Sequence, residues 1–184
     1  MNELVYGWAL WLDDTQWSSR IHESFYLYNW IETIHVLSLT LSLGLLFLID
    51  LRVLGFVFQD VNPRQFARSL RWPMWLGFCV MFVTGFLLFY AVPVRTSQSI
   101  WFRFKLALLV LAAVNALLFN RELLRTGKEP FTLRLKLGAI SSMILWVGIV
   151  LFGRLIAYDW FDCVQQPPPW AWRVAGCLDG QEAF

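Results

Sequence analysis

The stretch TIHVLSLTLSLGLLFLI, residues 33–49, is a run of 17 residues without a charged side chain. Uncharged runs also occupy residues 72–94, 106–120 and 137–153. A helix needs about 20 mostly apolar residues to cross the hydrocarbon layer of a bilayer. The first, third and fourth runs reach that length only by including Glu32, Lys105 and Arg154 respectively. The pattern predicts four transmembrane helices, near residues 30–57, 73–93, 101–124 and 135–158.

The composition also indicates a membrane protein. Of the 184 residues, 58% are hydrophobic and 15% are charged, whereas soluble domains have about 45–50% and about 25%. The net charge of +2 is too small for a phosphate-binding surface, which argues against a nucleic-acid binder. The 11 Trp fit the aromatic belts of a bilayer protein. We therefore predict an all-α fold, a four-helix transmembrane bundle.

The chain divides into three expected parts. Residues 1–29 form an N-terminal arm with a short interfacial helix near residues 4–12, and we expect no cleaved signal peptide because the arm lacks a basic start. Residues 30–158 form the transmembrane domain. Residues 159–184 form an outer tail, where we expect residues 167–169, three prolines, to be extended.

Lys and Arg predict the orientation, because they concentrate in cytoplasmic loops. Arg20 is the only basic residue of the arm, and Arg173 is the only one of the tail. Both termini should therefore face the periplasm of a bacterial inner membrane. Nine of the 15 basic residues lie in the first and third connections, namely Arg52, Arg64, Arg68, Arg71, Arg121, Arg125, Lys128, Arg134 and Lys136.

This topology predicts the chemical state of the cysteines. Cys163 and Cys177 both lie in the outer tail, and an oxidising compartment favours a disulfide between them. No further Cys or His is near enough in the sequence to favour a metal site there. Cys79 lies within the second helix and is expected to be a small buried hydrophobic residue.

Polar residues cluster near the outer ends of the predicted helices. Glu32 and His35 are three residues apart and share one helix face, while Lys105 and Arg154 lie at the same depth; Arg103 and Tyr90 are further candidates. In a structural interpretation, Glu32 pairs with Lys105 or Arg154, and Ser38 and Ser42 permit close helix packing. In a functional one, this outer-leaflet pocket binds a ligand, since ionisable residues within membranes mark functional sites.

Three ligands remain open for this pocket. The first is b-type haem with His35 as an axial ligand, although His22 lies about 20 Å away along a straight helix and cannot be the second ligand. The second is copper or zinc on His35 and Glu32, which are too few for a closed site. The third is a quinone or a lipid bound by hydrogen bonds from the imidazole and a cation. We identify no catalytic residue.

Polar residues near the inner ends are expected to be structural. Asp50 should pair with Arg121 or Arg71, and Arg52 and Asn115 should help to fix the bundle. Small residues at Gly44 and at Thr84-Gly85 should permit close approach of neighbouring helices.

Several stretches of the sequence form one combined pattern. They are residues 23–28 (ESFYLY), 32–37 (ETIHVL), Gly44, 50–55 (DLRVLG), 84–85 and 88–89 (TG and LF), 102–105 (FRFK) and 115–119 (NALLF). Together they resemble a bacterial family of small four-helix inner-membrane proteins, a domain-of-unknown-function family. The resemblance covers roughly residues 20–155 and brings no established activity. It implies that the positions of Glu32, His35, Asp50, Arg52, Lys105 and Asn115 matter in the family.

The function we predict is that of a non-catalytic membrane subunit or ligand-binding module, acting through Glu32, His35, Lys105 and Arg154. The tail tryptophans Trp160, Trp170 and Trp172 suit docking to a protein partner or a second copy, and equally suit anchoring in lipid. A haem-carrying electron-transfer subunit and a copper-handling membrane protein are the alternatives.

Overall fold

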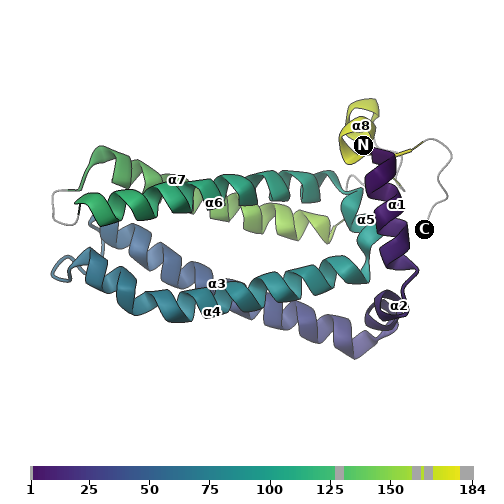
Figure 1. Ribbon diagram of the computed structural model, residues 1–184, viewed down its shortest axis with the longest axis horizontal. Coiled ribbons are helices and arrows are strands. Elements are labelled where there is room, and N and C mark those ends of the chain that lie inside the picture. The colour runs from purple at the N-terminus through teal and green to yellow at the C-terminus, as the bar shows by residue number, and fades with distance from the viewer. Residues whose placement is uncertain (1, 127–130, 159–162, 164–167, 179–184) are drawn as a thin grey trace. The chain divides into compact units, whose positions relative to one another are not determined.

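The computed structural model describes residues 2–126, 131–158, 163 and 168–178, which form helices and connections without a β-strand (Figure 1). Its long helices are α3 (Phe25–Leu54), α4 (Pro63–Ala91), α6 (Ile100–Thr126) and α7 (Leu133–Ile156). Each contains a segment long and apolar enough to cross a membrane. The predicted all-α, four-helix fold is therefore confirmed.

Helix α4 begins ten residues before the predicted start. Asn62 caps it, because its side-chain oxygen accepts a hydrogen bond of 3.0 Å from the Arg64 backbone N–H. Pro63 then occupies the first helical position, where its missing N–H costs nothing. Pro73, the first residue of the predicted span, lies inside the helix. Arg64, Arg68 and Arg71 consequently belong to the first turns of a helix and not to a loop.

Four short helices accompany the long ones, namely α1 (Asn2–Asp13), α2 (Gln16–Glu23), α5 (Pro93–Ser97) and α8 (Pro169–Ala175). Helix α1 confirms the predicted N-terminal helix and packs along α5 (Figure 1). The other three were not predicted. In the proline triplet, Pro168 is extended as expected, but Pro169 begins α8; Pro167 lies outside the described residues.

The chain forms two compact units, and each long helix contributes residues to both. Unit 1 comprises Met1–Ile34, Val83–Ala107 and Val150–Phe184, and unit 2 comprises His35–Phe82 and Leu108–Ile149. The core of unit 2 takes buried side chains from all four long helices: Leu43, Met81, Ala112, Trp146 and Ile149. In unit 1, Ile21, Ile31 and Ala91 pack together and join α2, α3 and α4.

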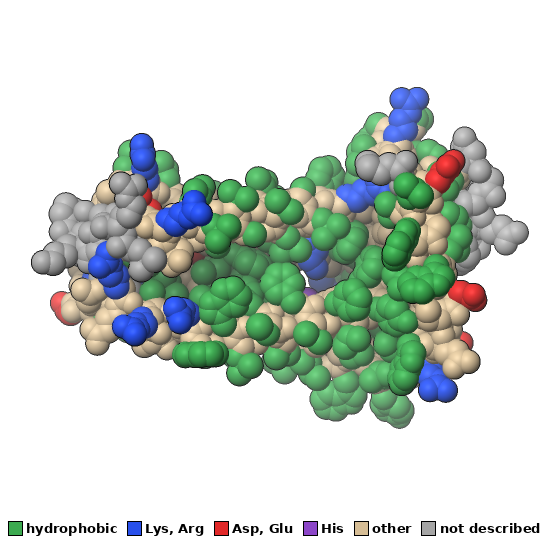
Figure 2. Space-filling view, viewed as in Figure 1, with side chains coloured by type: hydrophobic (Ala, Val, Ile, Leu, Met, Phe, Trp, Pro, Cys, Tyr) green, Lys and Arg blue, Asp and Glu red, His purple; other side chains and the backbone are tan. Residues whose placement is uncertain are grey.

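Large apolar side chains cover the outside of the long helices (Figure 2). Leu37, Val110 and Ile144 are each more than 60% exposed, which suits a lipid environment and not water. Two predictions fail on this surface. Cys79 is exposed and not buried, and Gly44 has no neighbour within 4 Å of where a Cβ would lie, so it permits no close helix approach.

Candidate functional site

His35 is half-buried on α3 in unit 2, and its ring is oriented by the neighbouring helix. The ring Nδ1 lies 3.0 Å from the backbone carbonyl oxygen of Met81 on α4. A carbonyl oxygen can only accept, so Nδ1 carries the proton and donates. In the neutral ring, the lone pair is then on Nε2. Histidines that bind metals are commonly held in this way, with the second ring nitrogen bonded to a carbonyl.

Lys105 lies on α6 in unit 1, and its side chain packs against Gly153 of the neighbouring helix α7. Its Nζ is 3.4 Å, and its Cε 3.7 Å, from the position that a Cβ would take on Gly153. The lysine is half-buried. Because Gly153 has no side chain, the aliphatic stem of Lys105 lies directly against the backbone of α7, one residue before Arg154.

Glu32 and Arg154 also belong to unit 1, but the predicted ion pairs do not form. Glu32 is half-buried on α3 and, in the part of the chain that the structure describes, pairs with neither Lys105 nor Arg154. Arg154 is exposed, and its guanidinium lies 5.3 Å above the ring centre of Tyr158. Glu32, Lys105 and Arg154 thus share unit 1, and their grouping with His35 of unit 2 stays a prediction.

Tyr90, a further candidate, forms a hydrogen bond with Thr15 of the N-terminal arm. Its hydroxyl oxygen is 2.5 Å from the Oγ1 of Thr15, the residue that caps α2. Nearby, the Ser18 hydroxyl donates to the carbonyl oxygen of Ala91 at 3.4 Å. Tyr90 therefore joins α4 to the α1–α2 connection within unit 1.

Of the predicted inner polar residues, Asp50 and Arg52 are buried and Asn115 is half-buried. Asp50 is 1% exposed, and its hydrogen-bond partner is the Ser142 hydroxyl of α7. The predicted pairing with Arg121 or Arg71 is wrong: both arginines have exposed side chains, whereas Asp50 is buried. Ser142 was not singled out from the sequence, because serines are common in the apolar runs and only the bundle shows which one meets the acid.

Arg52 and Asn115 bind backbone carbonyls. Arg52 is 3% exposed, and its Nε and Nη2 donate to the carbonyl oxygens of Val61 and Gln59 at 2.9 and 2.8 Å. It therefore closes the connection between α3 and α4. Asn115 of α6 donates its side-chain N–H to the carbonyl oxygen of Gly138 on α7 at 3.0 Å.

The described part of the C-terminal tail is closed by a disulfide and belongs to unit 1. Cys163 and Cys177 form the predicted disulfide, with Cα atoms 5.5 Å apart. Trp172 packs against this disulfide, whereas Trp170 is 59% exposed; Trp160 lies outside the described residues. The Arg103 guanidinium lies against Gly176, the left-handed residue that ends α8, and its Nε donates to the Ser97 carbonyl oxygen at 3.5 Å.

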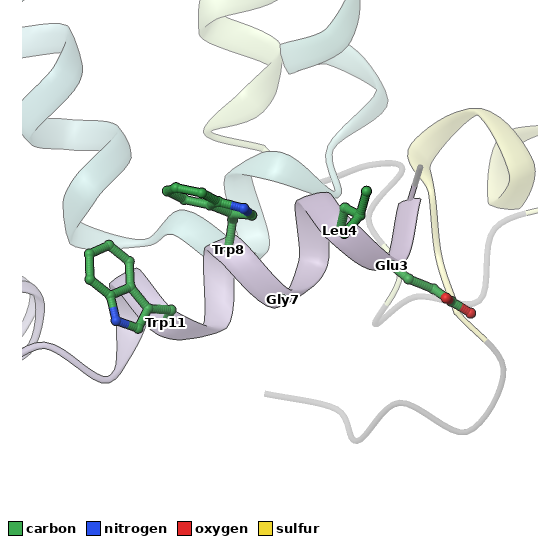
Figure 3. Close-up of a pocket in the computed structure, with 5 residues that line it drawn as sticks. All are labelled: Glu3, Leu4, Gly7, Trp8 and Trp11. Carbon is green, nitrogen blue, oxygen red and sulfur yellow. The ribbon is translucent and has the colours of Figure 1, made fainter.

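Helix α1 carries a shallow apolar hollow of about 400 Å³ (Figure 3). Glu3, Leu4, Gly7, Trp8 and Trp11 line it. Trp8 and Trp11 meet edge to face, with ring centres 6.0 Å apart, and both are more than 60% exposed. An exposed tryptophan pair on a short helix is typical of a membrane interface. The hollow contains none of the predicted site residues.

The described residues place few metal-binding side chains close together. Over residues 2–126, 131–158, 163 and 168–178, no three His, Cys, Asp or Glu side chains come together as a metal site would need. A metal ion or haem iron at His35 would therefore need ligands other than a group of three such side chains.

Comparison with known proteins identifies a family. The model of a family of unknown function, DUF6644, matches residues 19–159, so the chain belongs to that family. No curated protein and no solved structure matches the chain. The predicted resemblance to a domain-of-unknown-function family is confirmed.

Proposed function

We propose that this DUF6644 protein is a non-catalytic module of a bacterial inner membrane, which binds a small ligand through Glu32, His35, Lys105 and Arg154. The contact of Lys105 with Gly153 carries the proposal. Lys105 lies within a segment apolar enough to cross a membrane, and none of the described carboxylates is its ion-pair partner. An ammonium group is costly at such a position and marks a ligand pathway or site.

The chemistry of these side chains favours a ligand with acceptor oxygens. Lys105 offers three N–H donors and no acceptor, and Arg154 can donate from its guanidinium. A quinone carbonyl or a lipid headgroup oxygen suits such donors. His35 is the further donor or acceptor that we assign to the same ligand.

The location is part of the proposal. Basic residues gather around the α3–α4 and α6–α7 connections, including Arg64, Arg68, Arg134 and Lys136, which supports a cytoplasmic position for these connections. Both termini then face the periplasm, where the disulfide of the tail would persist. The exposed Trp170 supports docking of the tail to a protein partner or a second copy, with lipid as its other neighbour.

Binding of a short-chain quinone analogue and of an anionic lipid to the detergent-purified protein tests the ligand. Lys105→Gln should weaken binding of one of them about tenfold or more, because a hydrogen bond from a charged group contributes about 1.5–3 kcal/mol. Lys136→Gln, which changes an exposed lysine of α7, is the matched control. If neither probe binds, or if both variants bind like the wild type, the proposal is wrong.

The second candidate function is electron transfer by b-type haem, with His35 as an axial ligand. The Nδ1–H bond to the Met81 carbonyl directs the lone pair of the neutral ring to Nε2. The purified protein should then show a Soret band and about one iron per one or two chains, both lost in His35→Ala and kept in His22→Ala. Copper in place of iron in the same sample would favour the third candidate, a copper-handling protein.

A further inference from the structure

Among the described residues, Asp50 is a buried carboxyl group without a counter-ion. Its side chain is 1% exposed, and its Oδ2 has no hydrogen-bond partner among the described residues. The Ser142 hydroxyl is the partner that its carboxyl group has. A buried carboxylate needs a cation or several donors to offset the lost hydration, and otherwise it takes up a proton. One hydroxyl donor does not meet that need.

The described charged groups of the surrounding helices either form hydrogen bonds with other residues or have exposed side chains. On α3, Arg52 donates to the carbonyl oxygens of the α3–α4 connection. On α4, the Nε of Arg64 donates to the Leu123 carbonyl oxygen at 3.1 Å. On α6, Glu122 accepts from the Thr132 hydroxyl at 3.2 Å. Arg71, Arg121, Arg134 and Lys136 have exposed side chains. None of these described groups forms an ion pair with Asp50.

Unit 2 adds a second polar contact one helical turn away from Ser142. Asn115 donates to the Gly138 carbonyl oxygen, and Gly138 precedes Ser142 by four residues on α7. Asp50, Asn115 and Ser142 therefore bring polar side chains from α3 and α6 to the same stretch of α7. One carboxylate, one hydroxyl and one amide are too few for a hard metal cation such as Ca²⁺, which takes about six to eight oxygens. A proton needs a single oxygen.

We propose that Asp50 is a proton-binding site of the transmembrane domain, with Ser142 as its hydrogen-bond partner. In uptake, a carboxylate oxygen takes a proton from hydronium, which leaves water and a neutral carboxylic acid. Release reverses the step. The proton exchanges with water. This site is independent of the ligand-binding function proposed above.

Infrared spectroscopy of the full-length protein in lipid nanodiscs tests the site directly. Aspartate labelled with a carbon isotope at its side-chain carboxyl identifies the aspartate bands. Exposed aspartates have a pKa of about 3.9 and are ionised at neutral pH. The labelled wild type should nevertheless show the C=O stretch of a protonated carboxyl, and this band should shift in D2O.

Variants then assign the band. Asp50→Asn should abolish it, whereas Asp60→Asn, which changes an exposed aspartate, should leave it intact. Ser142→Ala should move it to higher wavenumber because the hydroxyl donor is lost, and Ser141→Ala, at an exposed neighbouring serine, should not. The Ser142→Ala shift decides the assignment even if Asp50→Asn fails to fold. A wild type with ionised aspartates only, a band that survives Asp50→Asn, or a band unchanged in D2O would each overturn the proposal.

Discussion

The contact between Gly77 of α4 and Ser42 of α3 predicts a strong effect of one methyl group. Ser42 is fully buried, and its hydroxyl donates to the Ser38 carbonyl oxygen at 2.7 Å. A Cβ at Gly77 would overlap the Ser42 oxygen and lie 3.4 Å from the Ser38 carbonyl oxygen. Gly77→Ala therefore forces the hydroxyl to rotate out of its hydrogen bond, or the two helices to separate.

The magnitude follows from opposing terms. Overpacking a buried contact costs about 1–3 kcal/mol, and the lost serine hydrogen bond is part of that cost. Alanine returns up to about 1 kcal/mol through its better helix propensity. We expect Gly77→Ala to lower the free energy of unfolding by about 1–2 kcal/mol.

A double-mutant cycle in mild detergent, followed by Trp fluorescence during SDS titration, measures this contact. In the Ser42→Ala background, the new Cβ would meet the residue 42 Cβ at 3.5 Å, an ordinary contact. Gly77→Ala should then be almost harmless, giving a coupling energy of about 1 kcal/mol or more. Gly44→Ala, on the exposed face of α3, is the control. Equal stability of Gly77→Ala and Gly44→Ala, with no coupling to Ser42→Ala, would refute this account of helix packing.

Three further predictions concern the tail, and hydrogen exchange of α8 measures each. Cys163→Ser should accelerate exchange, because closing a loop of about 15 residues contributes about 3 kcal/mol; unchanged exchange would mean that the disulfide is not needed for the docked tail. Arg103→Gln should accelerate exchange because it removes the guanidinium packed against Gly176, whereas the exposed Arg173→Gln should not; equal effects would argue against this contact. Gly176→Ala should act likewise, since φ is +81° there and the left-handed region costs other residues about 1–2 kcal/mol; exchange as slow as in the wild type would contradict that strain.

The sequence predicted the architecture because the bilayer imposes a strong length and charge rule on each span. Uncharged runs located the four long helices, although the start of α4 was missed. There, Asn62 and Pro63 looked like loop residues, and only the cap geometry shows that they start a helix. The disulfide was predictable because Cys163 and Cys177 had no competing partner in the tail.

Side-chain partners were harder to predict because periodicity does not say which helix a residue faces. Asp50 was expected to pair with an arginine, yet it meets Ser142. Gly44 was expected at a helix contact, yet Gly77 takes that role because Ser42 lies opposite it. Tyr90, a further candidate for the outer polar pocket, bonds to Thr15 of the N-terminal arm, and its place in that pocket stays a prediction. Each error concerns rotation about a helix axis, which a nearly uniform apolar surface leaves open.

Glycines show how α6 and α7 pack and why Lys105 is exceptional. In unit 2, a Cβ at Gly148 would lie 2.9 Å from Leu108, and one at Gly138 would lie 3.2 Å from Phe119. Small residues matter at such contacts because the hydrophobic effect does little to drive helix association among lipid tails.

In unit 1, the α6 side chain that packs against Gly153 of α7 is that of Lys105. Leucine or phenylalanine would pack at Gly153 without the cost of a charge, so packing alone does not account for Lys105. The ligand proposed above would accept hydrogen bonds from the ammonium, so Lys105→Met should preserve stability while abolishing binding. Loss of stability without loss of binding would assign Lys105 to the bundle and not to the ligand.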